Sequence, residues 1–222
     1  MLIKGVFRVG LLAVAVFLYF VDRARLDFVA IFDQGLGGIF LWIVWSWLVV
    51  DMLFRIIPNK RIPIGARKHY ACSYSAAPPP KNGKPRLTHK GAFLSAAAWA
   101  AITTAALIAL FALNALNPAV VIIIVLAYSV ADMFFISFFC PFQKLFMRNR
   151  CCAVCRIYNW DYFMMCAPLI VFPGAYSVSL FALSAAVVLR WEWALRKNPH
   201  FFMEATNQNL RCGRCETKCR RS

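Results

Sequence analysis

The chain has 222 residues, of which 62% are hydrophobic and 15% are charged, and its mean hydropathy is +0.64. Soluble domains average roughly 45–50% apolar and about 25% charged residues, so this composition excludes an ordinary water-soluble enzyme, a disordered chain and a coiled coil. The formal net charge of +16 fits a basic protein face beside anionic lipid headgroups. We expect no nucleic-acid partner, because the sequence contains no spacing typical of a nucleic-acid-binding motif.

Apolar runs of about 18 residues or more, long enough to cross a bilayer, follow one another along the chain. Charged residues and no small-residue cleavage site follow the first run, so it predicts an uncleaved anchor helix. The last run, 157–193, is too long for one straight crossing, and Pro173-Gly174 predicts a turn that divides it. The sequence therefore predicts helices over about 5–21, 37–54, 92–116, 119–139, 157–172 and 175–195.

The basic residues predict how these helices are oriented. Six crossings place 23 of the 25 Lys and Arg residues on one side, whereas five crossings divide them 15 against 10. Because cytosolic segments carry the excess of Lys and Arg, the sequence predicts an all-α polytopic protein of a bacterial inner membrane. Its six transmembrane helices would form three hairpins, with both termini cytosolic. The fifth helix would reach only about 24 Å, which leaves a partly re-entrant path open.

Six segments follow from this topology. The transmembrane hairpins are 1–54, 92–139 and 157–196, and between and after them lie a Pro-rich cytosolic loop (55–91), a Cys-rich loop (140–156) and a Cys-rich tail (197–222). Residues 55–90 carry nine basic residues and no acidic residue. We expect this loop to lie on anionic lipid or on a partner subunit of a membrane complex.

The nine cysteines are the strongest chemical signal. In the six-helix topology most of them face the reducing cytosol, where clustered thiols indicate metal binding or redox chemistry rather than disulfides. Two Cys-x-x-Cys motifs from different segments supply the four thiolates of a tetrahedral zinc site. An iron–sulfur cluster remains the alternative, since there are more cysteines than four ligands require. The predicted ligands are Cys152, Cys155, Cys212 and Cys215, with Cys140, Cys151 and Cys219 as additional candidates.

Three aspartates, Asp51, Asp132 and Asp161, lie near the predicted cytosolic ends of helices. Carboxylates inside a membrane are costly and often functional, so one interpretation is a pathway for a cation or a proton. The other is structural pairing with an interfacial arginine, of Asp51 with Arg55 and of Asp161 with Arg156. Asp132 is the deepest of the three and has no base close by in the sequence.

No catalytic signature, such as a Walker A loop, Gly-x-Ser-x-Gly or His-Glu-x-x-His, occurs in the chain. The sequence therefore predicts a membrane scaffold or accessory subunit in which the metal is mainly structural. One alternative is an iron–sulfur subunit that passes electrons to a membrane quinone or a partner complex. Another is a small transporter that uses Asp132 and Asp51 as coupling sites.

Overall fold

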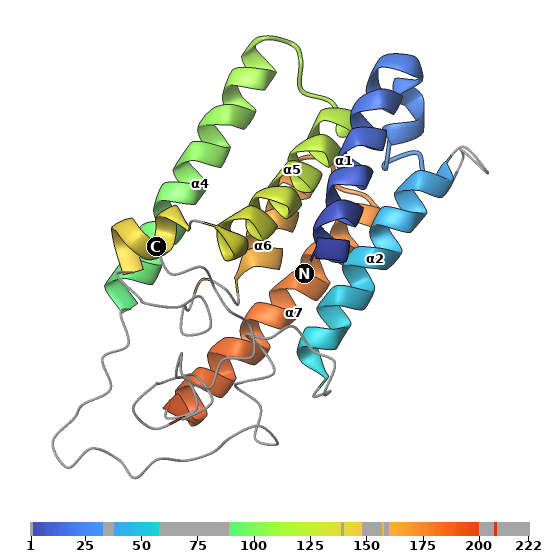
Figure 1. Ribbon diagram of the computed structural model, residues 1–222. Helices are drawn as coiled ribbons and strands as arrows, with labels where there is room; N and C mark the ends of the chain where they lie inside the picture. The colour runs from blue at the N-terminus through green and yellow to red at the C-terminus, as the bar shows by residue number, and fades with distance from the viewer. Residues whose placement is uncertain are drawn as a thin grey trace, which may run out of the picture.

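The computed structural model describes residues 2–32, 38–57, 89–138, 140–147, 157, 160–199 and 207. In these ranges the elements are helices, which confirms the all-helical prediction. Five of them are long and apolar enough to cross a membrane, as expected for a multi-pass membrane protein (Figure 1). These five are α1 (Leu2–Val21), α2 (Ile39–Ile56), α4 (His89–Ala112), α5 (Pro118–Ser137) and α7 (Ala175–Lys197).

The predicted fifth helix is the short one. It consists of α6 (Asp161–Cys166) and the 3-10 helix η7 (Ala167–Val171), which together rise only about 19 Å. The Asp161 carboxylate binds Arg55 near the end of α2, and the Phe172 ring lies 6.5 Å from the Phe28 ring, beyond the end of α1. Contacts at its two ends therefore join this short segment to opposite ends of the bundle.

Two predicted turns have clear local causes. Asn117 caps α5 because its side chain accepts a hydrogen bond from the Val120 N–H at 3.1 Å, and proline occupies the first turn of that helix. Asn114 just before it has a φ of 53°, in the left-handed region that asparagine tolerates better than most residues. At the start of α7, the Ser177 hydroxyl accepts the Gly174 N–H at 2.9 Å. The predicted turn at Pro173-Gly174 is thereby confirmed.

The closest packing mostly joins helices that are not consecutive in the sequence. α1 packs against α5 and α2 packs against α7, while α6 and η7 lie between α5 and α7. Of the three predicted hairpins, the third packs on itself, since α6 and η7 both contact α7. α4 stands at the edge of the bundle (Figure 1), where the Thr103 and Tyr128 hydroxyls lie 2.8 Å apart and the π-helical turn η4 (Gln143–Met147) packs against it.

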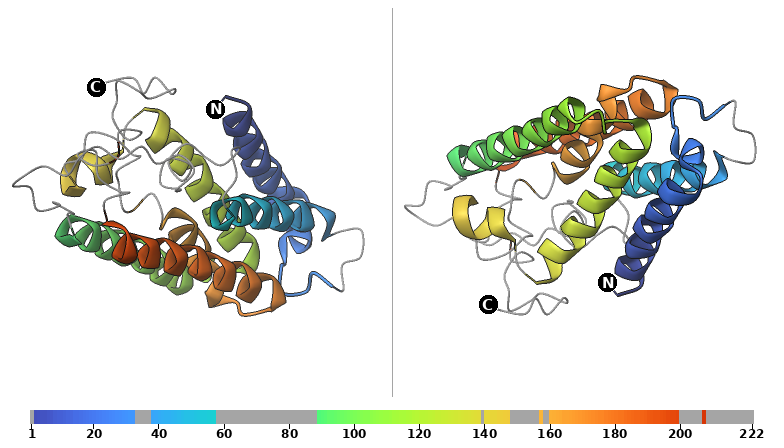
Figure 2. Two further views of the ribbon diagram at one scale, coloured as in Figure 1. Left: turned by 90° about the horizontal axis from the view of Figure 1, so that it is seen from below. Right: turned by 90° about the horizontal axis from the view of Figure 1, so that it is seen from above.

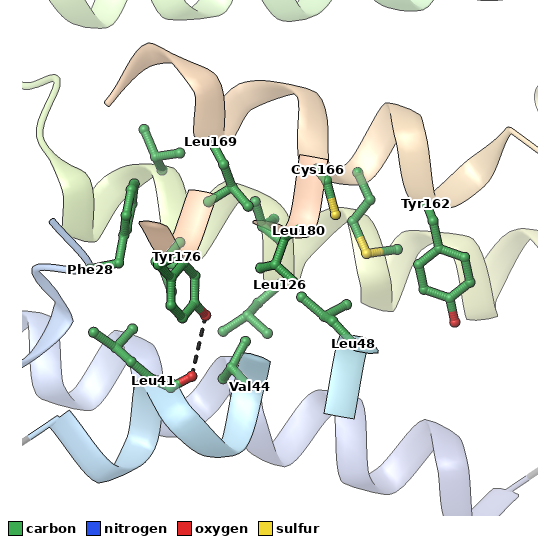
Figure 3. Packing of buried hydrophobic residues seen from close by; sticks show 14 of the residues in the cluster. Phe28, Leu41, Val44, Leu48, Leu126, Tyr162, Cys166, Leu169, Tyr176 and Leu180 are labelled. Atoms are coloured by element: carbon green, nitrogen blue, oxygen red, sulfur yellow. Dashed lines mark hydrogen bonds between the residues drawn. The ribbon is translucent and has the colours of Figure 1, made fainter. Parts of the chain in front are cut away.

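A buried apolar core fills the bundle. Beyond α1, the chain forms the short helix η1 (Arg23–Leu26) and then folds inward, so that Phe28 is fully buried and its ring stacks on Tyr176 at 5.5 Å. The Tyr176 hydroxyl donates to the Leu41 carbonyl at 3.3 Å. We call the end of the bundle that contains η1, Phe28 and Tyr176 the η1 end. Figure 3 shows the core between Phe28 and Tyr162, which includes Leu41, Val44, Leu48, Leu126, Leu169 and Leu180.

Candidate functional site

A cluster of charged and hydroxyl side chains lies at the end of the bundle opposite η1. At this end α1 and α6 begin and α2 and α5 finish, so residues far apart in the sequence meet. The cluster contains three acidic and three basic groups, which balance in formal charge. We call it the polar cluster, and its members are Lys4, Arg8, Asp51, Arg55, Asp132, Asp161 and Tyr162.

Arg8 occupies the centre of the polar cluster and is only 5% exposed. One guanidinium nitrogen donates to an Asp132 carboxylate oxygen at 3.0 Å and to the Ser129 carbonyl at 2.9 Å. The other lies 3.5 Å from the Asp51 carboxylate. The base that Asp132 lacks in its own sequence neighbourhood is therefore supplied by α1, 124 residues earlier in the chain.

Asp51 is contacted from two other helices. The Tyr162 hydroxyl of α6 donates a short hydrogen bond to the same carboxylate oxygen that faces Arg8. The ammonium group of Lys4 lies 3.6 Å from the other oxygen. Asp51 is thus the member of the polar cluster that links α2 to both α1 and α6.

Arg55 binds Asp161 through two parallel hydrogen bonds of 2.6 Å each. This arrangement matches the planar fork of a guanidinium to both oxygens of a carboxylate. The Arg55 guanidinium also lies 4.4 Å from the centre of the Tyr162 ring. The sequence expected Arg55 to pair with Asp51, but its bidentate partner is Asp161. The expected pairing of Asp161 with Arg156 stays a prediction, because Arg156 lies outside the described residues.

The environment of the polar cluster determines what it can do. Charged groups that leave water are strongly destabilising unless they are paired and hydrogen-bonded, and each of the three aspartates contacts at least one basic side chain. From Tyr162 towards the η1 end, the core continues with apolar side chains such as Leu48 and Leu126 (Figure 3). The geometry is that of a charge-neutralised network that cross-links four helical segments.

Sequence reasoning identified the three aspartates but missed Lys4, Arg8 and Tyr162 as their partners. A signal for Arg8 was present, because an arginine inside an apolar run is as unfavourable in a membrane as an aspartate and needs a partner equally. Tyr162 gave no such signal, since tyrosine is common near membrane interfaces.

The proposed metal ligands lie mostly outside the described residues. This holds for Cys152, Cys155, Cys212 and Cys215 and for the additional candidates Cys151 and Cys219. Cys140 is half-buried between α5 and η4. Within the described ranges, no three His, Cys, Asp or Glu residues form a group that could hold a metal ion.

One described contact joins the start of α6 to the last turns of α7. The Trp160 indole N–H, directly before α6, donates to the Glu192 carboxylate in the last turns of α7 at 2.8 Å. The start of α6 therefore lies beside the final part of α7. Comparisons with family models, curated proteins and solved structures give no match to this chain.

Proposed function

We propose that this chain is a multi-pass inner-membrane scaffold or accessory subunit, with a Cys-ligated zinc site on its cytosolic face. The charge-balanced polar cluster is the observation that carries the scaffold assignment. A transporter that couples through carboxylates must release and rebind its cation or proton. Here Asp132 is bound by Arg8 at 3.0 Å. Asp51 faces Arg8 at 3.5 Å and Lys4 at 3.6 Å and accepts the Tyr162 hydroxyl. Both carboxylates of the transporter alternative are therefore already paired, a geometry that favours helix cross-linking over ion exchange.

The proposed topology has six crossings and cytosolic termini. It is supported by the contacts of the short segment formed by α6 and η7, which joins Arg55 at the cluster end to Phe28 at the η1 end. The polar cluster would then face the cytosolic leaflet, together with most of the Lys and Arg residues. An anionic headgroup layer next to that face is the expected lipid partner.

The proposed zinc ligands are Cys152, Cys155, Cys212 and Cys215. Two Cys-x-x-Cys motifs are the ligand pattern of structural zinc sites, and the contact between Trp160 and Glu192 joins the two described helix ends that are nearest to these motifs in the sequence. Cys155 precedes Trp160 closely, and Cys212 follows the end of α7. A zinc ion bound by all four thiolates would link the Cys-rich tail, 197–222, to the Cys-rich loop, 140–156. An iron–sulfur cluster is the second candidate, because three further cysteines accompany these four.

Metal analysis of the full chain, purified in detergent without oxygen, tests this proposal. We expect about one zinc per chain and no visible colour. Cys152→Ala and Cys215→Ala should each lose the metal and lower the yield of folded protein. Cys166→Ala is the matched control, because Cys166 is buried in α6 and is not a proposed ligand, so it should retain the zinc.

Iron with broad visible absorption would assign electron transfer instead. The absence of both metals would overturn the metal site.

A further inference from the structure

The helices of the bundle form a nearly closed ring. α1 packs on α5, α5 on α6 and η7, these on α7, and α7 on α2. In this packing order α1 is the first helix and α2 is the last, so contacts between α1 and α2 complete the ring. At the η1 end the junction between α1 and α2 is closed by η1, which packs against α1, α2 and α5.

At the cluster end, side chains bridge α1 and α2. The Phe7 and Trp47 rings lie 5.9 Å apart, and the Arg8 guanidinium is 5.3 Å from the Trp47 ring centre. Asp51 adds ion pairs with Lys4 and Arg8. Both views in Figure 2 show α1 and α2 close together near η1 and diverging towards the start of α1. We call this side-chain junction the α1–α2 seam.

The ion pairs across the seam are longer than those on either side of it. Asp51 lies 3.6 Å from Lys4 and 3.5 Å from Arg8. On the α1 side, Arg8 contacts Asp132 of α5 at 3.0 Å. On the α2 side, Arg55 binds Asp161 of α6 at 2.6 Å. Lys4 is also 61% exposed, so solvent and salt weaken its contribution. The seam is therefore the weakest part of the polar cluster.

We propose that the α1–α2 seam is a lateral joint, which opens at the cluster end while η1 holds the other end as a hinge. Asp51 is the positioning residue of the closed state, because it is bound to Tyr162 on the α6 side and receives Lys4 and Arg8 across the seam. Opening moves α1 away from α2 at the cluster end, while α6 and η7 still join α5 to α7, and it exposes the buried groups of the polar cluster at the seam. This device goes beyond a static scaffold, which would need no hinge.

Amide hydrogen exchange of the full chain in lipid nanodiscs, followed by mass spectrometry, tests the joint. Lys4→Gln removes one exposed ion pair and should raise exchange in the first turns of α1 and the last turns of α2 roughly twofold to fivefold. Asp51→Asn removes the charge that both bases face and should raise it by about tenfold or more in the same segments. Exchange around Phe28 and Tyr176 should stay unchanged in both variants.

Asp22→Asn is the matched control, since it removes the ion pair that Asp22 forms with Arg25 at 2.8 Å, at the opposite end of α1. It should not alter exchange at the seam. Lys4→Gln keeps the proposal testable if Asp51→Asn does not fold, because Lys4 lies at the exposed edge of the cluster. Unchanged exchange at the seam in folded Lys4→Gln and Asp51→Asn protein, or an equal rise at both ends of the bundle, would overturn the hinge.

Discussion

At the cluster end of the bundle, charged and hydroxyl side chains join four helical segments, whereas at the η1 end the rings of Phe28, Phe172 and Tyr176 fill the space between them. Ion pairs and hydrogen bonds depend on one partner in one geometry, but ring packing depends mainly on shape and volume. The comparison shows that one small bundle uses directional contacts to set helix position at one end and non-directional packing to seal the other. Substitutions should therefore destabilise the bundle through a lost partner at the cluster end and through lost side-chain volume at the η1 end.

The largest expected effect follows from removing the base of the tightest ion pair. Arg55→Met leaves the buried Asp161 carboxylate without its bidentate partner, which should lower the free energy of unfolding by about 3–5 kcal/mol. Unfolding in mixed detergent, followed by tryptophan fluorescence, measures this. The double variant Arg55→Met with Asp161→Leu should recover most of the loss, because no charge is left unpaired. A double variant as unstable as the single one would contradict the directional account of this end.

At the η1 end the expected effect is somewhat smaller and depends on volume. Phe28→Ala empties a fully buried site and should cost about 3 kcal/mol, while Phe28→Leu should cost about 1 kcal/mol. The same unfolding measurement applies. Phe32→Ala is the control, because this nearby ring is 68% exposed and its loss should have little effect. Equal losses for Phe28→Ala and Phe32→Ala would show that η1 does not close this end.

The smallest expected losses of stability come from removing the hydroxyl groups of Tyr162 and Tyr176, one at each end of the bundle. Tyr162→Phe removes a hydrogen bond to the charged Asp51, which should lower stability by about 1 kcal/mol. Tyr176→Phe removes a 3.3 Å hydrogen bond to the neutral Leu41 carbonyl and should have a smaller effect, because bonds to charged acceptors are stronger. Unfolding midpoints compared side by side provide the measurement. A larger loss for Tyr176→Phe would reverse the contrast between the two ends.

Hydropathy and turn chemistry were sufficient to predict most of the helices. The turns at Asn117 and at Pro173-Gly174 lie where expected, because capping and helix termination depend on neighbouring residues. Within the predicted fifth helix, 157–172, the structure describes an α-helix over Asp161–Cys166 and the 3-10 helix η7 over Ala167–Val171. Hydropathy does not distinguish one helical geometry from another.

The partners inside the polar cluster could not be predicted in the same way. Asp51 and Arg55 are close enough in sequence to pair on one helix, yet the bidentate partner of Arg55 is Asp161, 106 residues away. Which helix supplies a partner depends on how the helices pack, and the pairing of α1 with α5 and of α2 with α7 leaves no pattern in hydropathy. The three aspartates could be found from their cost in an apolar segment, but their partners required the structure.

The position of Arg8 has a consequence for biosynthesis. Ribosomes add roughly 5–20 residues per second, so Asp132, which is 124 residues later, is made roughly 6–25 s after Arg8. During that interval the α1 guanidinium is without its closest carboxylate, and an isolated arginine in a helix reaches towards the headgroups for hydration. α1 can therefore reach its final depth in the membrane only after α5, the fourth long apolar helix along the chain, has been made and packs against it.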